Sequence, residues 1–268
     1  MAMKKKRGNV ILGLDVGNTR THVGIFKGKE IVGHWSLSSR ESRVADEYWI
    51  LLRAFLGTIG ITSLDGAIVA SVVPRLSRVY REVLRERFGC DPAFVNGDMR
   101  LGIRLLVDRP GEVGADRIAN SVAAAEIFGE DVIVVDLGTA TTFDVVSRER
   151  EYLGGVIAPG IETSAARLFE GTAKLPQVEI KKMERVVGKN TEEAIRSGLF
   201  FGAVGQIDGI VRRIVAEWGR SPRVIATGGL AEIVYPASET IDEMDLHLTL
   251  KGLRIIYDGL QGRRPKGA

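Results

Sequence analysis

The sequence lacks several of the residues and segments on which common protein classes depend. Cys90 is the single cysteine among 268 residues, so neither an intrachain disulfide nor a cysteine-based metal cluster can form. The three histidines are scattered without the spacing of metal ligands. No apolar run approaches the ~18 residues that a membrane span needs. We therefore expect a cytoplasmic protein in a reducing compartment, with no membrane partner.

An excess of one charge is also missing. Lys and Arg number 37 against 34 Asp and Glu, which gives a formal net charge of +3. This near balance predicts no broad positive field and no nucleic-acid partner. Basic residues do gather at 4–7 and 263–266, a pattern more typical of solvated chain ends.

Three familiar catalytic signatures are absent too. Gly188–Thr191 resembles the end of a phosphate-binding loop, but Met183 stands where the first glycine belongs. The chain has no Gly-x-Gly-x-x-Gly dinucleotide fingerprint and no Gly-x-Ser-x-Gly nucleophile elbow. These absences weigh against the commonest nucleotide-binding and hydrolase classes.

What the chain does contain is one pattern twice. Ile11–Thr19 and Ile133–Thr142 are each an apolar run that ends in an acid and passes into a glycine turn with hydroxyl side chains. Two further strands and then helical patterns follow each copy. The repetition predicts two related lobes, 8–125 and 126–262, each a mixed β-sheet flanked by helices.

The expected elements of the two lobes follow the same order. Strands are predicted at 21–26, 30–36 and 66–73, then at 142–146, 152–157 and 223–227. Helices are predicted at 46–56, 76–88, 161–169, 191–217 and 248–260. A linking helix at 116–128 has Asp116 as its expected N-cap and Gly129 as its C′ residue.

The first copy of the pattern has the chemistry of a phosphate site. Gly17 lets backbone amides turn toward an anion, and Asn18, Thr19 and Thr21 add neutral donors. Because a carboxylate repels phosphate, Asp15 implies Mg²⁺ if a nucleotide binds here. The alternative is a hairpin turn in which the polar side chains only satisfy the backbone.

The second copy offers a similar set of groups. Asp136 ends an apolar strand, and the hydroxyls of Thr139, Thr141 and Thr142 can line a phosphate chain. The alternative is a threonine-rich strand start, since threonine favours strands. Gly138 and Thr139 stand where the first copy has Gly17 and Asn18, which favours the functional interpretation.

A third segment lies between the copies. Pro110–Arg117 is a loop with two glycines that enters a predicted helix, and the helix dipole favours anions at its start. Asp116 can accept a proton from an alcohol there, and Arg117 can pair with a substrate carboxylate. An ordinary N-cap aspartate beside a solvated arginine explains the same spacing equally well.

A glycine pair closes the set of candidates. Gly228 and Gly229 follow a predicted strand, and such small residues let a flat ring or ribose approach the backbone. A plain strand-to-helix turn is the alternative.

Together these segments resemble the acetate and sugar kinase, Hsp70 and actin superfamily, and within it the type III pantothenate kinases. The carrying motifs are Asp-x-Gly-Asn-Thr at 15–19, Gly-Ala-Asp-Arg at 114–117 and Asp-x-Gly-Thr-Ala at 136–140. Further matching stretches lie at 154–160, 172–176, 188–191, 228–229 and 249–253, so the resemblance runs from about residue 10 to 260. It implies an α/β fold of two ribonuclease-H-like, actin-like ATPase lobes.

The resemblance also implies roles by position. Asp116 is similar to the general base that deprotonates the primary hydroxyl of pantothenate, and Asp136 to the ligand of a monovalent cation, K⁺ or NH₄⁺. Asp15 would face Mg²⁺ through the phosphates. The implied pantothenate contacts are Gly114, Ala115, Asp116, Arg117, Thr191 and Val107. The implied ATP contacts are Asp15, Val16, Gly17, Asn18, Thr19, Arg20, Thr21, His22, Thr139, Gly228 and Gly229.

The family implies a cytoplasmic homodimer that uses ATP to phosphorylate pantothenate in the first step of coenzyme A synthesis. One position departs from its pattern, because Val107 stands where many members carry a tyrosine near pantothenate. Two other hypotheses remain open at this point: a sugar kinase of the same superfamily, and a non-enzymatic accessory factor for transcription.

Overall fold

The computed structural model describes residues 10–171 and 176–262, so the basic chain ends and residues 172–175 of one matching stretch lie outside the described residues. The chain forms two compact units. The first holds the described residues up to Gly102, Arg109–Ala123 and the described residues from Thr249 onward, and the second holds Ile103–Asp108 and Ala124–Leu248. The division differs from the expected 8–125 and 126–262, chiefly because the last helix joins the first unit.

The first unit is built on a five-stranded sheet of order β3-β2-β1-β4-β5. Its strands are β1 (Val10–Val16), β2 (Arg20–Lys27), β3 (Glu30–Ser38), β4 (Gly66–Ser71) and β5 (Ala93–Phe94). Its helices are α1 (Ala45–Thr58), α2 (Pro74–Glu82) with a π-helical turn at Val83–Arg87, a 3₁₀ turn at Pro110–Glu112, most of α3 (Ala115–Ile127) and most of α7 (Leu248–Leu260).

The second unit has a six-stranded sheet of order β11-β10-β7-β8-β9-β6. Its strands are β6 (Arg104–Leu105), β7 (Val132–Leu137), β8 (Ala140–Ser147), β9 (Glu151–Pro159), β10 (Arg223–Thr227) and β11 (Glu243–Met244). Its helices are α4 (Ile161–Glu170), α5 (Thr191–Trp218) and α6 (Ala231–Val234), followed by a 3₁₀ turn at Tyr235–Ala237.

The two sheets repeat one topology, as the duplicated sequence pattern predicts. In each, three antiparallel strands are followed by two that run parallel to the first, β3-β2-β1-β4-β5 against β9-β8-β7-β10-β11. Even the irregularities correspond. The second strand shifts register between Ile25 and Phe26 in one sheet and between Val145 and Val146 in the other, each four residues after its equivalent threonine, Thr21 or Thr141.

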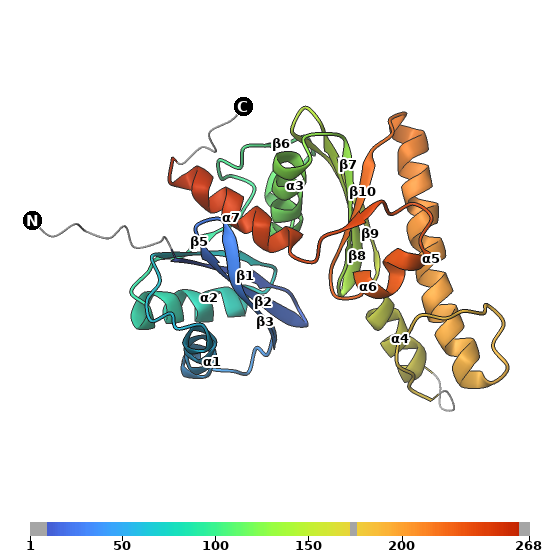
Figure 1. Cartoon of the computed structure of the whole chain (residues 1–268), viewed down its shortest axis with the longest axis horizontal. Coiled ribbons are helices and arrows are strands. Elements are labelled where there is room, and N and C mark those ends of the chain that lie inside the picture. The colour runs from blue at the N-terminus through green and yellow to red at the C-terminus, as the bar shows by residue number, and fades with distance from the viewer. Residues whose placement is uncertain (1–9, 172–175, 263–268) are drawn as a thin grey trace, which may run out of the picture. The chain divides into compact units, whose positions relative to one another are not determined.

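The sheet of the first unit is covered on both faces (Figure 1). Leu12, Leu14 and Val16 alternate onto one face, where they pack with buried residues of α1 and α2. The other face carries Gly13 and Gly24, and a Cβ added to either would touch side chains of α7. The helix α7 in turn lies directly against α3, because a Cβ on Gly252 would overlap the backbone of Ala119.

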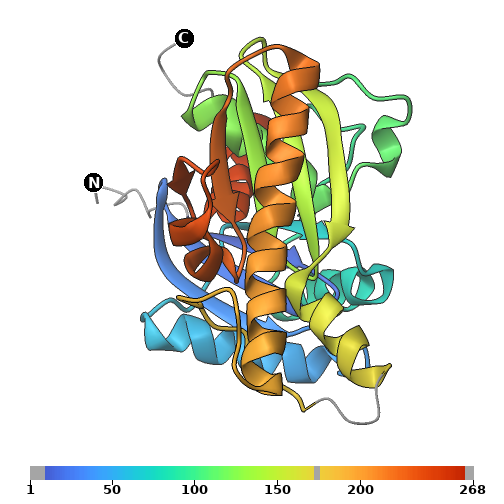
Figure 2. The same cartoon turned by 90° about the vertical axis from the view of Figure 1, so that its right-hand side faces the viewer.

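The sheet of the second unit packs one face against the 28-residue helix α5, which runs along it in Figure 2. Ile133, Val135 and Leu137 of β7 alternate onto that face and form a core with buried residues of α5, among them Phe200 and Ile207. The remaining residues of β7, including Asp136, therefore point to the opposite face.

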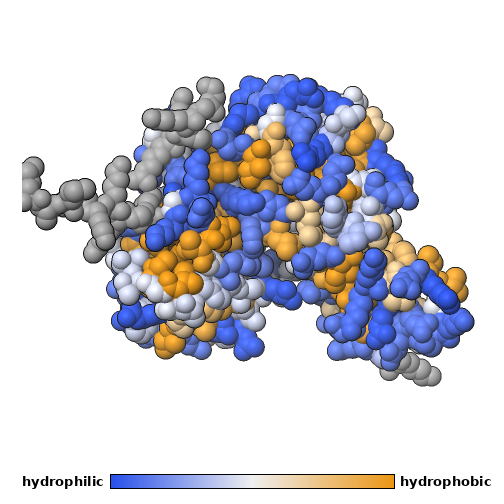
Figure 3. Space-filling model, viewed as in Figure 1, coloured by the Kyte–Doolittle hydropathy of each residue, from blue (hydrophilic) through white to orange (hydrophobic). Residues whose placement is uncertain are grey.

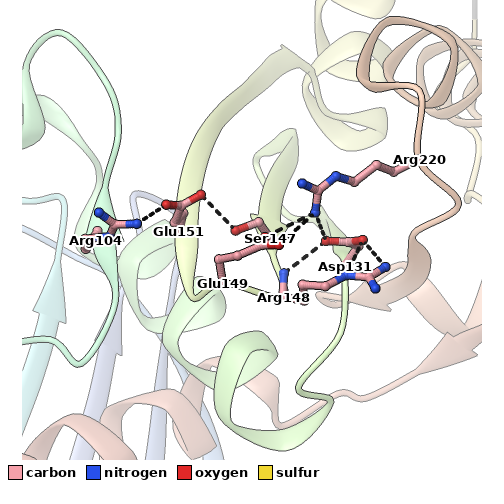
Figure 4. A network of polar contacts seen from close by, with 7 residues as sticks. All are labelled: Arg104, Asp131, Ser147, Arg148, Glu149, Glu151 and Arg220. Carbon is pink, nitrogen blue, oxygen red and sulfur yellow. Dashed lines mark hydrogen bonds and ion pairs between the residues drawn. The ribbon is translucent and has the colours of Figure 1, made fainter.

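A polar network centred on Asp131, Arg148 and Arg220 lies at one end of this sheet (Figure 4). The Asp131 side chain is 1% exposed, and its carboxylate accepts bonds of 3.0 Å from the Arg148 backbone amide, 2.9 Å from Arg148 Nε and 2.9 Å from Arg220 Nη1. Burial raises the pKa of Asp131, but these donors outweigh it and the pKa is lowered. Arg220 also pairs with Glu149 at 3.1 Å.

Hydrophilic residues predominate on the face of the molecule drawn in Figure 3, with smaller hydrophobic groups between them. Within 10–171 and 176–262, no helix combines the length and apolarity needed to cross a bilayer. Cys90 is buried, and burial raises the pKa of its thiol to about 11, which keeps it protonated and unreactive at neutral pH.

Two local expectations need correction. The linking helix begins at Ala115, so Asp116 lies inside its first turn and is not the N-cap; Gly114 precedes the helix and its carbonyl accepts the Ile118 amide at 3.0 Å. The predicted helix 76–88 is an α-helix to Glu82 that widens into a π-helical turn. Gly129 does adopt the left-handed conformation (φ 64°) expected after a helix end.

Candidate active site

The first acidic turn lies at the end of β1. The Gly17 amide donates to the Arg20 carbonyl at 3.0 Å, which closes the turn and leaves Asn18, Thr19 and Arg20 exposed at its tip. Such a turn carries hydroxyl, amide and guanidinium groups of the kind that bind anions, and the predicted ATP contact here stays a prediction.

Two hydroxyl side chains, the buried Thr21 and the half-buried Ser39, hold the base of the turn. Thr21 is fully buried, and its Oγ1 lies 2.8 Å from the Oγ of Ser39, whose amide donates to the Thr19 carbonyl at 2.9 Å. Tyr80 is also fully buried, and burial raises its pKa so that the phenol stays neutral. Ser39 could not be predicted from the sequence, because its partner is 18 residues away and no local pattern marks it.

Asp15 has a defined orientation. It pairs with His22 across β2 and with Ala70 across β4. Since side chains alternate along a strand, Asp15 points to the same face as Gly13, the face that α7 covers. It is half-buried. One carboxylate at a strand end beside a donor-rich turn suits Mg²⁺, which is commonly bound by one or two carboxylates together with substrate phosphates.

The second acidic turn is built in the same way. The Gly138 amide donates to the Ala140 carbonyl at 3.1 Å, which makes Gly138 the counterpart of Gly17. Thr141 is buried like Thr21, and Thr139 is exposed at the tip. The turn is one residue shorter than its counterpart.

The start of α4 in the second unit contacts this turn. A Cβ on Gly160 would lie 2.4 Å from the Thr139 carbonyl oxygen, and Thr163 Oγ1 donates to that same oxygen at 2.6 Å. The start of α4 therefore fixes the turn. Thr163 was not predicted from the sequence, because its only signal is this contact with a residue 24 positions earlier.

The structure brings Gly228 and Asp136 together. Gly228 follows β10, whose Thr227 pairs with Asp136, and a Cβ on Gly228 would lie 2.6 Å from Asp136 Oδ1. Its φ of 91° also favours glycine. Gly228 therefore gives the Asp136 carboxylate its space, and the exposed Gly229 follows it in the chain. In the described part of the chain, no three His, Cys, Asp or Glu side chains cluster as metal ligands.

The third acid is presented at the start of α3. Asp116 Oδ1 accepts the Arg117 amide at 2.8 Å, and Ser121 Oγ donates to the Arg117 carbonyl at 2.8 Å. Upstream, a Cβ on Gly97 would overlap the Pro110 carbonyl, so the loop that leads to the helix lies tightly against the body of its unit. Asp116 and Arg117 are half-buried, a setting in which a carboxylate remains within reach of an alcohol.

The remaining predicted residues belong to the second unit. Thr191 is the exposed first residue of α5, whose N-cap Asn190 accepts the Glu193 amide at 2.9 Å. Val107 follows β6, and its Cγ1 would lie 3.7 Å from a Cβ on Gly154 of β9. Asp15, Asp116 and Arg117 belong to the first unit.

Comparison with known proteins gives these observations a family context. Residues 11–213 match the model of a family described as type III pantothenate kinase. A type III pantothenate kinase from Moorella thermoacetica is 44% identical over 251 residues, which cover 93% of this chain and 99% of that protein.

Solved structures show the same fold at low identity. A Campylobacter jejuni protein described as a candidate Baf family transcriptional activator matches with a TM-score of 0.59 and 18% identity, over 94% of this chain and 99% of that one. A Listeria monocytogenes protein described as a candidate N-acetylmannosamine kinase gives 0.50 and 16%, over 95% and 100%. The expected α/β fold of two ribonuclease-H-like lobes, each a mixed sheet flanked by helices, is confirmed.

Proposed function

The chain belongs to the type III pantothenate kinase family, and from this premise we propose that it transfers the γ-phosphoryl group of ATP to the primary hydroxyl of pantothenate, which yields 4′-phosphopantothenate for coenzyme A synthesis. The observation that carries the proposal is the 44% identity to a type III pantothenate kinase over 93% of the chain, with the Gly-Ala-Asp-Arg motif at the start of α3. The likenesses to a transcriptional activator and a sugar kinase fall below 20% identity and concern the fold alone.

Asp116 is the proposed general base. Its carboxylate is oriented by the Arg117 amide, and an oriented carboxylate can take the hydroxyl proton as the new P–O bond forms. Phosphoryl transfer demands mainly alignment and charge stabilisation, so no covalent intermediate with the protein is required. Ala115, Arg117, Thr191 and Val107 are proposed to contribute to pantothenate binding.

The two glycine turns are proposed to hold ATP. Residues 15–22 of the first unit offer donors to the phosphates, with Asp15 toward Mg²⁺, and the second unit adds Thr139, Gly228 and Gly229. Bound Mg²⁺ would neutralise developing negative charge on the phosphates. Asp136 is proposed as the ligand of a monovalent cation, K⁺ or NH₄⁺, because it stands at the end of β7 beside the Gly138 turn. We also propose that the protein acts as a cytoplasmic homodimer.

The first prediction concerns the base. Asp116→Asn removes the proton acceptor and should lower kcat by about 10²–10⁴-fold, the usual contribution of general acid–base catalysis. Pantothenate-dependent formation of ADP, measured with and without K⁺, tests the activity, and ATP titration should show that nucleotide binding survives. Asp98→Asn, which alters an exposed aspartate of the same unit, is the matched control.

Two outcomes would contradict the proposal. Full activity of Asp116→Asn would remove Asp116 from the role of base. Phosphorylation of glucose or N-acetylmannosamine, with no turnover of pantothenate under any cation condition, would replace the proposed substrate with a sugar.

A further inference from the structure

Gly114 makes an unusually close approach to the carboxylate of Asp116. A Cβ built on Gly114 would lie 2.5 Å from Asp116 Oδ1, a distance that real Cβ atoms essentially never show. The same Oδ1 accepts the Arg117 amide at 2.8 Å. The carboxylate is thus folded back over Gly114, between the backbone of 114 and the amide of 117.

The Asp116 carboxylate is the group that occupies the space beside Gly114. The other atoms near the built Cβ are Arg117 Cγ and Asp116 Cγ, both at 3.7 Å, which is ordinary van der Waals contact. Gly114 is not among the glycines with positive φ, so its backbone conformation is open to other residues. A methyl group here would therefore displace the end of one side chain and leave the fold in place.

We propose that Gly114 is a positioning residue for the reaction: it leaves the space in which the Asp116 carboxylate takes a single orientation toward the acceptor hydroxyl. The catalytic consequence of this proposal rests on the proposed function. The contact between Gly114 and the Asp116 carboxylate does not depend on that function. The proposal differs from the role that the family resemblance implies for Gly114, because a residue that touches pantothenate would affect its binding, whereas a positioning residue affects the chemical step.

The second unit contains a comparable arrangement. A Cβ on Gly228 would lie 2.6 Å from Asp136 Oδ1. A glycine without a side chain thus shapes the surroundings of a carboxylate in both units. At Gly228 the backbone of Leu137 is equally close, and φ is 91°, so a side chain there would strain the backbone as well as displace the carboxylate. At Gly114 a side chain would displace the carboxylate alone.

The kinetic test compares Gly114→Ala with Gly111→Ala. Gly111 is an exposed residue of the same loop, and a Cβ there would meet nothing within 4 Å. We expect Gly114→Ala to lower kcat about 100-fold, the loss typical of a reacting group displaced by about 1 Å. The KM values for ATP and pantothenate should change by less than about threefold, and Gly111→Ala should match the wild type. A raised pantothenate KM with kcat unchanged would overturn the proposal, because it indicates lost ground-state binding.

A stability cycle tests the contact without any activity measurement. Gly114→Ala should lower the unfolding midpoint in the wild-type background, because the carboxylate loses its place and its amide donor. In an Asp116→Ala background, which removes the carboxylate, the same change should have no cost. An equal cost in both backgrounds would overturn the proposal. If the wild type turned over no pantothenate, the proposed function would fail while this cycle still decided whether Gly114 positions Asp116.

Discussion

The carboxylate of Asp131 is buried, whereas the two arginines that neutralise it, Arg148 and Arg220, remain partly exposed. Asp131→Ala removes the shared acceptor of Arg148 and Arg220, and because both guanidinium groups can turn to water we expect it to lower the free energy of unfolding by about 2 kcal/mol, the range of a hydrogen bond to a charged group. Urea denaturation measures the change. Glu149→Gln, which alters an exposed partner of Arg220, should lower the free energy of unfolding much less, because exposed ion pairs contribute little; similar losses in both variants would contradict the assignment.

The same carboxylate predicts a pH dependence. Because the pKa of Asp131 is lowered in the folded protein, its contribution is fully present above the unfolded value of about 3.9 and is lost as the pH falls from there through the folded value. The stability difference between the wild type and Asp131→Asn should therefore narrow as the pH falls below about 4. A difference that stays constant from pH 7 to pH 3 would show that ionisation of this group contributes nothing.

At the level of single residues, the sequence identifies the acids but not their surroundings. The glycine turns after Asp15 and Asp136 follow from a local pattern, and their equivalent hydrogen bonds confirm it. The contacts of Ser39 and Thr163 with these turns could not be predicted, because each joins residues that are 18 or more positions apart. The roles of the acids in catalysis stay predictions.

Among the helices, α7 and α3 come into contact at a glycine. Gly252→Ala would drive a methyl group into the backbone of Ala119, which cannot move aside as a flexible side chain can. We expect a loss of about 1–3 kcal/mol in the free energy of unfolding. Gly259→Ala lies in the same helix with nothing within 4 Å and should stabilise by up to about 1 kcal/mol. Thermal denaturation of both variants checks the contrast, and equal effects would contradict this packing.

The regular elements were largely predictable because periodicity is strong where an element is long. The expected strands 21–26 and 142–146 fall within β2 and β8, and the turn at Gly28 shows the positive φ that glycine permits. The two-residue strands β5, β6 and β11 were missed, because two residues cannot display a period of two. The cap of α3 was misplaced by two residues, at Asp116 in place of Gly114, because both are plausible caps in sequence.

At the scale of the whole chain, the first unit depends on its last helix. The apolar face that carries Gly13 and Gly24 is covered by Leu250 and Leu253 of α7, which the sequence placed in the other lobe because only distance along the chain was visible. A chain that stops after Leu248 should lose amide protection throughout the first unit while β7, β8 and α5 keep theirs. Hydrogen exchange with mass spectrometry measures this, against the full chain. Equal loss in both units would show that they unfold as one.

The late position of α7 also has a consequence for biosynthesis. A ribosome releases the segment of the second unit, Ala124–Leu248, before the helix that covers the first sheet has been synthesised. Domains usually fold in the order of their synthesis. Here the first unit, whose synthesis begins first, can complete its folding only after the second unit has been synthesised. Until the C-terminal helix emerges, the nascent chain carries an uncovered apolar sheet face, which is a natural point for chaperone binding and for aggregation of incomplete chains.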